Sequence, residues 1–207
     1  MAFPNNFNGM TKIDQLKERF RRKGIFSVRE LEREGFPYVY LSRLCAKGFI
    51  DRIGRGVYSC PAYSGTEYNS YAEAAAVVPQ GVVCLFSALK IHGLTLENPH
   101  RIHLAVPKGA RIPTNDLPVD FYHFSPASYA FGIDEVSTRD GRFRVYCVEK
   151  TLADCFKFRN VIGLDVAIAA LRDVRERMRI DHERLWRAMD VCRMKRVMRP
   201  YLDSFFA

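Results

Sequence analysis

Residues 36–60 read FPYVYLSRLCAKGFIDRIGRGVYSC. The first half is typical of a short helix, since Pro37 suits a first helical position and Lys47-Gly48 resembles a helix end. The second half has two short apolar runs around Gly54-Arg55-Gly56, whose glycines permit the positive φ of a tight turn. These residues therefore predict a helix followed at once by a small hairpin with Arg55 at its tip.

Two further short helices are expected before this segment. Thr11 can cap a helix whose apolar side chains recur at positions 13, 16 and 20, and which three cations followed by Gly24 would end. Ser27 and Glu30 form a capping box, in which each side chain satisfies the other's backbone N–H, for a second helix that ends at Gly35. Three short helices and a hairpin predict a winged helix-turn-helix over residues 1–62.

The faces of the third helix can be assigned at 100° per residue. Leu41, Leu44 and Cys45, with Tyr38 beside them, should pack on the first two helices. The opposite arc carries Arg43, which could form two hydrogen bonds with guanine, together with small residues and hydroxyl groups that could reach phosphates or base edges. Including the arginines of the hairpin, the candidate DNA-binding residues are Val39, Tyr40, Ser42, Arg43, Lys47, Arg52 and Arg55.

The net charge of +9 is unevenly distributed. Residues 1–62 carry 12 Lys and Arg against 6 Asp and Glu, residues 63–148 carry 7 against 8, and residues 149–207 carry 13 against 9. Two basic ends around a near-neutral middle indicate modules with different roles, and the basic winged helix favours DNA as its partner. The alternative is a winged helix that binds an acidic protein without specific DNA recognition.

The composition limits the class of protein. With 207 residues, 48% of them hydrophobic, the chain can form one core or two smaller ones. The six cysteines include no CxxC pair, as expected of buried thiols in a reducing cytoplasm rather than of disulfides or a zinc site. No apolar run is long enough for a signal peptide or a membrane span. We therefore expect a soluble, cytoplasmic protein.

Residues 63–207 predict a second domain of mixed structure. Thr66 is expected to cap a helix that runs to Val78, and residues 82–92 predict a buried helix entered through a short extended segment. Alternating polar and apolar residues predict a short sheet with strands at 101–106, 119–124 and 143–148. Further helices are expected over 149–159, 165–178, 181–192 and 194–206. The predicted fold class is α+β, a winged helix-turn-helix followed by a mixed domain with a helical C-terminal part.

The predicted helix at 164–178 has two different faces. Its apolar positions, which should be buried, are Val166, Ile168, Ala169, Leu171 and Val174. The opposite face carries arginines at 172, 175, 177 and 179. Such a face is solvated in most proteins, although it could also contact DNA or an acidic partner.

No catalytic or cofactor motif is present in the sequence, which lacks GxGxxG, a P-loop, HExxH and GxSxG. His100 and His103 are three residues apart at a strand start, so they should point to opposite faces and cannot share a metal. Cys147 and Cys155 have no activating partner nearby in the sequence and should be buried. We expect no catalytic residues, metal or cofactor; an enzyme whose carboxylates meet only in the fold is the least favoured alternative.

Three segments of the sequence contain motifs of one known family. Residues 44–58, LCAKGFIDRIGRGVY, fit the pattern L-x-x-x-G-hydrophobic-hydrophobic-x-R-x-x-R-G-x-Y and so resemble AbiEi-type antitoxins. Residues 83–94, VCLFSALKIHGL, resemble that family's segment ending in S-A-L-x-x-H-G-L, and residues 149–154, EKTLAD, resemble its segment ending in T-L-x-D. The three motifs occur in the family's order.

The resemblance implies a two-module antitoxin from an abortive-infection or toxin–antitoxin operon. It implies that the winged helix binds double-stranded DNA at inverted repeats and represses the operon's own promoter. It also implies that the second module counteracts a partner nucleotidyltransferase toxin, often without forming a stable complex. The wing signature falls on Gly48, Arg52, Arg55, Gly56 and Tyr58. The other two motifs supply residues that we interpret as structural, with hydroxyl and imidazole groups whose hydrogen bonds fix helix ends. These residues are Ser87, His92, Gly93, Thr151 and Asp154.

Overall fold

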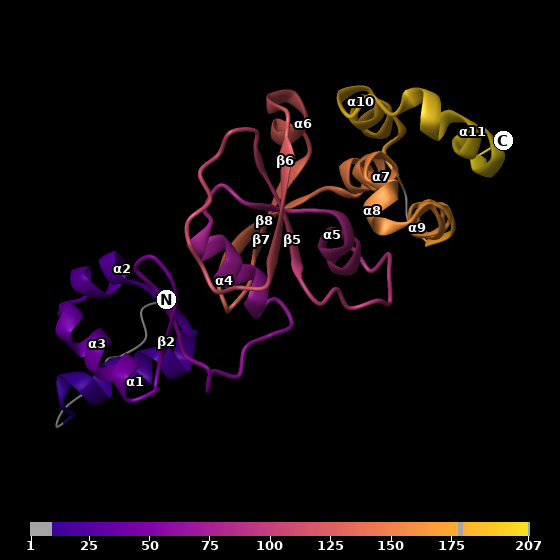
Figure 1. The fold of residues 1–207 in the computed structure, drawn as a ribbon. Coiled ribbons are helices and arrows are strands. Elements are labelled where there is room, and N and C mark those ends of the chain that lie inside the picture. The colour runs from indigo at the N-terminus through magenta and orange to yellow at the C-terminus, as the bar shows by residue number, and fades with distance from the viewer. Residues whose placement is uncertain (1–9, 178–179, 207) are drawn as a thin grey trace. The chain divides into compact units, whose positions relative to one another are not determined.

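The computed structural model describes residues 10–177 and 180–206, which form two compact units (Figure 1). The first unit contains residues 10–79 together with two later segments, 112–117 and 137–142. The second unit contains the other described residues. The predicted α+β class, with N-terminal helices and a hairpin followed by a mixed domain, is confirmed. The first unit extends beyond residue 62, to Pro79. The domain boundary at residue 62 stays a prediction.

The first unit opens with the three predicted helices. α1 (Lys12–Lys23) begins after Thr11, whose hydroxyl accepts the Asp14 N–H, and ends at Gly24. α2 (Val28–Arg33) begins after Ser27, whose hydroxyl accepts the Glu30 N–H. The reciprocal half of this capping box is wrong, because the Glu30 carboxylate accepts a hydrogen bond from Lys23 instead. α3 (Tyr38–Ala46) begins one residue later than predicted, with Pro37 at the N-cap.

A three-stranded antiparallel sheet, in the order β1-β3-β2, completes the winged helix. The predicted hairpin is formed by β2 (Asp51–Gly54) and β3 (Val57–Ser59). The third strand, β1 (Ile25–Ser27), was not predicted, because three residues are too few to show an alternating pattern. The core of this unit lies between the helices and the sheet and includes Leu16, Phe20, Phe26, Leu31, Leu41, Leu44 and Ile50.

The fourth helix, α4 (Asn69–Val77), packs against all three strands of this sheet. The prediction that Thr66 caps it is wrong, since the N-cap is Tyr68. The Thr66 hydroxyl instead accepts the Tyr68 N–H within the preceding turn and donates to the buried carboxylate of Asp140. Asp140 also accepts from the Tyr63 hydroxyl, so residues 63–66 are tied to the segment 137–142 within the first unit.

The second unit is built on a mixed five-stranded sheet in the order β6-β5-β4-β8-β7. β4 pairs antiparallel with β5 and parallel with β8, and β5 pairs parallel with β6. Three of these strands match the predicted ones, whereas β7 and the short helix α6 (Pro126–Ala130) were not predicted. The strands are β4 (Val82–Val83), β5 (Ile102–Pro107), β6 (Val119–Phe124), β7 (Ile133–Ser137) and β8 (Arg142–Tyr146).

Helices of the second unit gather around α7, which packs against α5, α9 and α10 (Figure 1). The predicted helices are confirmed, and α8 is an additional short turn between α7 and α9. On α9 the burial of Ala169 was predicted wrongly: it is exposed, because it lies two residues from both Ala167 and Leu171 and so on the far side of the helix. Arg179 lies outside the described residues. The helices are α5 (Leu85–Ile91), α7 (Val148–Lys157), α8 (Arg159–Ile162), α9 (Leu164–Arg177), α10 (His182–Val191) and α11 (Lys195–Phe206).

Candidate nucleic-acid interface

Helix α3 presents a solvent-exposed arc opposite its buried side. Leu41 and Leu44 are buried in the core of the first unit. The residues exposed on the opposite side are Val39, Ser42, Arg43, Ala46 and Lys47. The predicted arc therefore stands clear of the core of its own unit, as entry into a major groove requires.

The burial of the two tyrosines that flank this arc is the reverse of the prediction. Tyr38 was expected on the packed side but is 49% exposed. Tyr40 was expected among the DNA-binding residues but is half-buried against the core. Both tyrosines lie at the border of the buried side, Tyr40 about 70° and Tyr38 about 90° from the midpoint between Leu41 and Leu44, so contacts with the rest of the core decide which of them is covered. Tyr38 is thus the tyrosine better placed for contact outside the unit.

Tyr38 also links the helix to the hairpin. Interaction with the hydroxyl groups of Tyr58 on β3 and of Ser42 one turn further along α3 lowers the pKa of Tyr38. Burial raises the pKa of Tyr58 to about 12, and its interaction with Tyr38 adds to this shift. Tyr38 of α3 and Tyr58 of the hairpin therefore lie close enough to influence each other.

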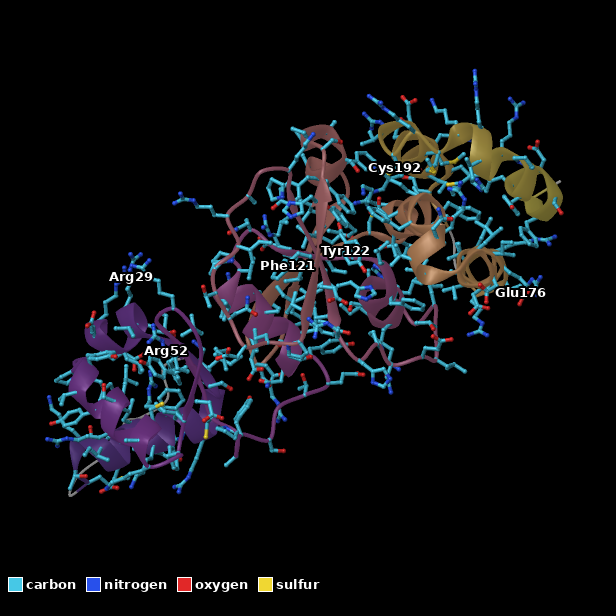
Figure 2. All side chains as sticks on the ribbon, in the orientation of Figure 1. Arg29, Arg52, Phe121, Tyr122, Glu176 and Cys192 are labelled. Atoms are coloured by element: carbon cyan, nitrogen blue, oxygen red, sulfur yellow. The ribbon has the colours of Figure 1, made fainter. Side chains whose placement is uncertain are left out.

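The hairpin places two further arginines beside α3. Arg52 lies opposite Tyr58 in the register of β2 and β3, and its Nε donates to the carbonyl of Gly54 (Figure 2). Arg55 is exposed in the turn, where Gly56 has a φ of 71°. The carbonyl of Gly56 accepts the N–H of Val28, so the turn is anchored to the start of α2. Arg55 is thus an exposed cation on a fixed support.

Gly54 was predicted to allow a positive φ in the turn, but the structure requires glycine there for packing. It has no positive φ, so turn geometry does not require glycine there. A Cβ at this position would instead lie 2.7 Å from Cγ1 of Val77 on α4, closer than van der Waals contact allows. The glycine therefore permits close packing of the hairpin against α4.

The cations of α3 and the hairpin are not neutralised within the protein. No described residue forms an ion pair with Arg43, Lys47, Arg52 or Arg55. Cations on α1 behave differently, since Arg19 pairs with Glu34 and Arg22 with Glu18. Unpaired cations produce the positive potential that attracts the phosphates of a duplex. Arg43, Lys47, Arg52 and Arg55 therefore supply unpaired positive charge on α3 and the hairpin, alongside the exposed Arg29 and Arg33 of α2.

In the second unit, two of the predicted motif residues converge on one backbone carbonyl. The Nε2–H of His92, at the end of α5, donates to the carbonyl oxygen of Tyr146 at 2.7 Å. The hydroxyl of Thr151 on α7 donates to the same oxygen at 3.2 Å. Ser87 accepts the backbone N–H of His103 on β5. These side chains join α5 and α7 to the sheet, in keeping with the structural role proposed for them.

Asp154, the last motif residue, forms a buried ion pair with Lys150. The Nζ of Lys150 donates to Oδ2 of Asp154 at 2.5 Å, and both side chains are fully buried. The ammonium also lies 4.6 Å from the ring centroid of Phe124 and 4.2 Å from that of Tyr146. The thiol of Cys192 donates to the other carboxylate oxygen. Burial raises the pKa of Asp154, and the charge of Lys150 opposes that shift.

Cys147 and Cys155, the two cysteines singled out in the sequence, are buried in the second unit. Burial raises the pKa of both Cys147 and Cys155, which keeps these thiols protonated and unreactive. Within residues 10–177 and 180–206, no three His, Cys, Asp or Glu side chains are placed to hold a metal ion. In the same part of the chain, each helix is too short or too polar to cross a membrane.

Comparison with protein-family models gave two matches that follow one another along the chain. Residues 14–61 match a model described as a transcriptional regulator, AbiEi antitoxin. Residues 81–200 match the AbiEi antitoxin C-terminal domain, which covers more than half of the chain. The chain belongs to the AbiEi antitoxin family. A comparison with curated proteins gave no match.

In this AbiEi antitoxin, the first match covers most of α1 and extends through β3, the elements that form the winged helix. The sequence did not indicate two features of the sites. One is Tyr38, whose exposure depends on how α3 rests on the core; the other is Lys150, buried beside Asp154. The spacing of Lys150 and Asp154, four residues apart, was the available signal for an ion pair on one helix face.

Proposed function

We propose that this AbiEi antitoxin is a transcriptional autorepressor that binds its own promoter through the winged helix. In this proposal α3 enters the major groove and the turn of the hairpin contacts the phosphate backbone. The observation that carries the proposal is the exposed arc of α3 with Arg43 and Lys47, which form no ion pair with a described residue, in the same winged helix as the exposed Arg52 and Arg55. Such a regulator acts in the cytoplasm, where its DNA lies.

The experiment that tests this proposal is a gel shift with the DNA immediately upstream of the gene. We expect binding to that duplex to be tighter than to a scrambled duplex of equal length, and to weaken as salt rises. Two binding steps are expected if the site consists of inverted repeats. Equal affinity for both duplexes would leave only non-specific binding, and the absence of binding at low salt would favour a protein partner for the winged helix.

Arg43→Ala should weaken binding to the promoter by about 1–3 kcal/mol, the usual contribution of an arginine that reads a base. Binding to the scrambled duplex should change much less. Arg187→Ala, which removes the same charge from an exposed position on α10, is the matched control. Fluorescence anisotropy with both duplexes measures the difference. An equal loss with both duplexes would assign Arg43 to the phosphates rather than to a base.

Arg55→Ala should weaken binding to both duplexes by the same factor, because a turn that lies on the backbone contacts phosphates of any sequence. The slope of log K against log salt should become shallower by about 1, since one phosphate contact is lost. A salt titration of the parent and the variant measures this slope. A change confined to the promoter duplex would contradict this role for the hairpin.

We further propose that the second unit, α5 to α11 with its five-stranded sheet, counteracts a nucleotidyltransferase toxin. Family membership supports this part of the proposal. Co-expression with the gene adjacent to this one should rescue growth that the neighbour alone arrests. An Arg43→Ala and Arg55→Ala double variant should rescue equally well, because DNA binding and toxin counteraction reside in different units. Failure of the parent chain to rescue would remove this part of the proposal and leave the repressor function standing.

A further inference from the structure

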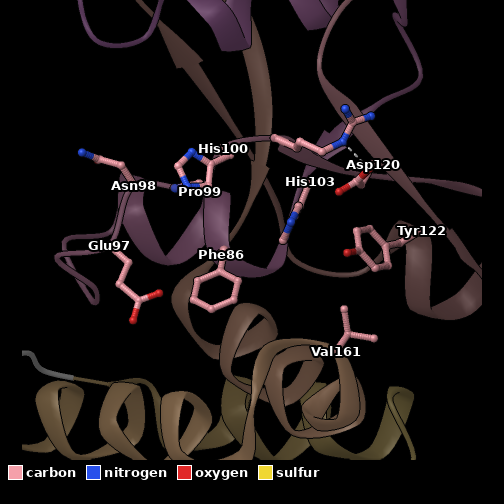
Figure 3. A pocket seen from close by; sticks show the side chains of 10 residues that line it. Phe86, Glu97, Asn98, Pro99, His100, His103, Asp120, Tyr122 and Val161 are labelled. Atoms are coloured by element: carbon pink, nitrogen blue, oxygen red, sulfur yellow. Dashed lines mark hydrogen bonds and ion pairs between the residues drawn. The ribbon is translucent and has the colours of Figure 1, made fainter.

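A cavity of about 600 Å³ opens on the second unit beside α5, β5 and β6 (Figure 3). Its volume lies within the range of about 300–1,000 Å³ typical of small-molecule sites. All of its lining residues belong to the second unit, and none is among the motif residues Ser87, His92, Thr151 and Asp154. The cavity is therefore a feature that neither DNA binding nor the structural motifs explain.

Aromatic rings form one wall of the cavity. His103 on β5 lies between Phe86 of α5 and Tyr122 of β6, with ring centroids 5.9 and 5.3 Å away (Figure 3). Both contacts are edge-to-face, which fixes the three rings relative to one another. Val161 adds an apolar side chain that is 60% exposed. Such a wall suits a flat, heteroaromatic ligand, which can stack on one ring while its edge meets the next.

The charged groups of the cavity favour a ligand that donates hydrogen bonds. Glu97 and Asp120 lie on opposite sides of it in the view of Figure 3. Oδ1 of Asp120 accepts from Nε of Arg101 at 2.7 Å, whereas no described residue donates to its Oδ2. Burial lowers the pKa of His103, so its imidazole is neutral at pH 7. With Arg101 as the single cation of the lining, the cavity carries a net charge of −1 in a chain of +9.

His103 has capacity for an additional hydrogen bond. Its Nδ1 is buried and has no partner within the described residues. A buried ring nitrogen without a partner is unfavourable, so a hydrogen bond from a bound polar group would stabilise it. The rigid aromatic wall, the free carboxylate oxygen and this imidazole together define the chemistry of the ligand.

We propose that this cavity binds a purine nucleoside that carries an exocyclic amino group, such as adenosine or guanosine. The purine ring stacks on Phe86 with its edge towards His103, and its amino group donates to Oδ2 of Asp120. The negative charge of the lining excludes a phosphate, so the free nucleoside binds in preference to its nucleotide. The ribose occupies the open part of the cavity.

Isothermal titration calorimetry on the full chain tests the ligand chemistry. Adenosine or guanosine should bind, and purine riboside, which lacks the amino group, should bind at least about tenfold more weakly, the loss expected of a hydrogen bond to a charged acceptor. AMP and GMP should also bind more weakly than their nucleosides. Absence of binding by both nucleosides at millimolar concentration would overturn the proposal, and so would equal affinity for purine riboside or tighter binding of the monophosphates.

Two variants separate recognition from the shape of the cavity. Asp120→Leu removes the acceptor and should weaken nucleoside binding about tenfold or more. Arg101→Met breaks the same ion pair but keeps the carboxylate, so binding should be unchanged or tighter. An equal loss in both variants would mean that the ion pair only maintains the cavity, which would overturn the role of Asp120. Phe86→Ala, which leaves the ion pair intact, should weaken adenosine and purine riboside by the same factor because both stack on that ring.

Discussion

Asp154→Asn should lower the free energy of unfolding of the second unit by about 3–5 kcal/mol, because it leaves a buried ammonium without its counter-charge. Lys150 and Asp154 are both fully buried, so water cannot solvate the charge that remains. The neutral amide keeps the size of the carboxylate, and the loss is therefore electrostatic rather than steric. Urea unfolding followed by the fluorescence of Trp186, the single tryptophan of the chain, measures the change in this unit.

Two controls decide whether burial causes this effect. Arg199 and Asp203 form a pair with the same four-residue spacing on α11, but their side chains are 71% and 72% exposed. Asp203→Asn should leave the unfolding midpoint unchanged, because exposed ion pairs contribute little. The double replacement Lys150→Met with Asp154→Leu should recover most of the stability lost in Asp154→Asn, since apolar pairs replace buried ion pairs well. Equal stability of Asp154→Asn and the parent would show that the ion pair is unimportant.

Gly24→Ala should destabilise the winged helix by about 2–4 kcal/mol, the sum of two costs. The first is the φ of 84° at this helix C-cap, which disfavours any residue with a Cβ. The second is steric, because the new Cβ would lie 2.3 Å from Cδ1 of Tyr63. Tyr63 cannot move freely, since its hydroxyl donates to the buried Asp140. The alanine therefore disturbs the network that joins residues 63–66 to the first unit.

Gly35→Ala is the matched control for backbone strain. Gly35 has a φ of 81°, and nothing lies within 4 Å of a Cβ built there. Alanine at this position therefore has the cost of the positive φ but no steric clash. Hydrogen–deuterium exchange measured on peptides from α1 and β3 reports the stability of the first unit in both variants. In a Tyr63→Ala background the cost of Gly24→Ala should fall to that of Gly35→Ala. Equal costs of the two glycine replacements in the parent background would contradict the clash with Tyr63.

Much of the winged helix was predictable because its signals are local. A capping hydroxyl, a glycine after a run of cations and a pair of glycines in a turn act on residues within one or two turns of the chain. The bounds of α1, the hairpin and the buried side of α3 were therefore recognisable from neighbouring residues alone. Angular periodicity also separated Arg43 and Lys47 from Leu41 and Leu44, because the α-helix repeats every 3.6 residues.

The errors fall where position depends on distant parts of the chain. Tyr38 and Tyr40 both lie at the border of the buried side of α3, and contact with the rest of the core decided which of them is covered. β7 carries Asp134 and Glu135 and lies at the edge of its sheet, so it lacks the apolar alternation of an inner strand. Gly54 was interpreted as a turn residue because Val77, the side chain that requires it, lies 23 positions away.

The sequence by itself determined the winged helix, the mixed second domain and the exposed cations of α3 and the hairpin, because each depends on interactions between residues close together in the chain. Only the tertiary structure decided the strand order β6-β5-β4-β8-β7, the convergence of His92 and Thr151 on one carbonyl, and the cavity lined by Phe86, His103 and Tyr122. These features join residues tens of positions apart. Their geometry depends on how the helices pack against the sheet, which is decided by residues from many parts of the chain and not by any short segment.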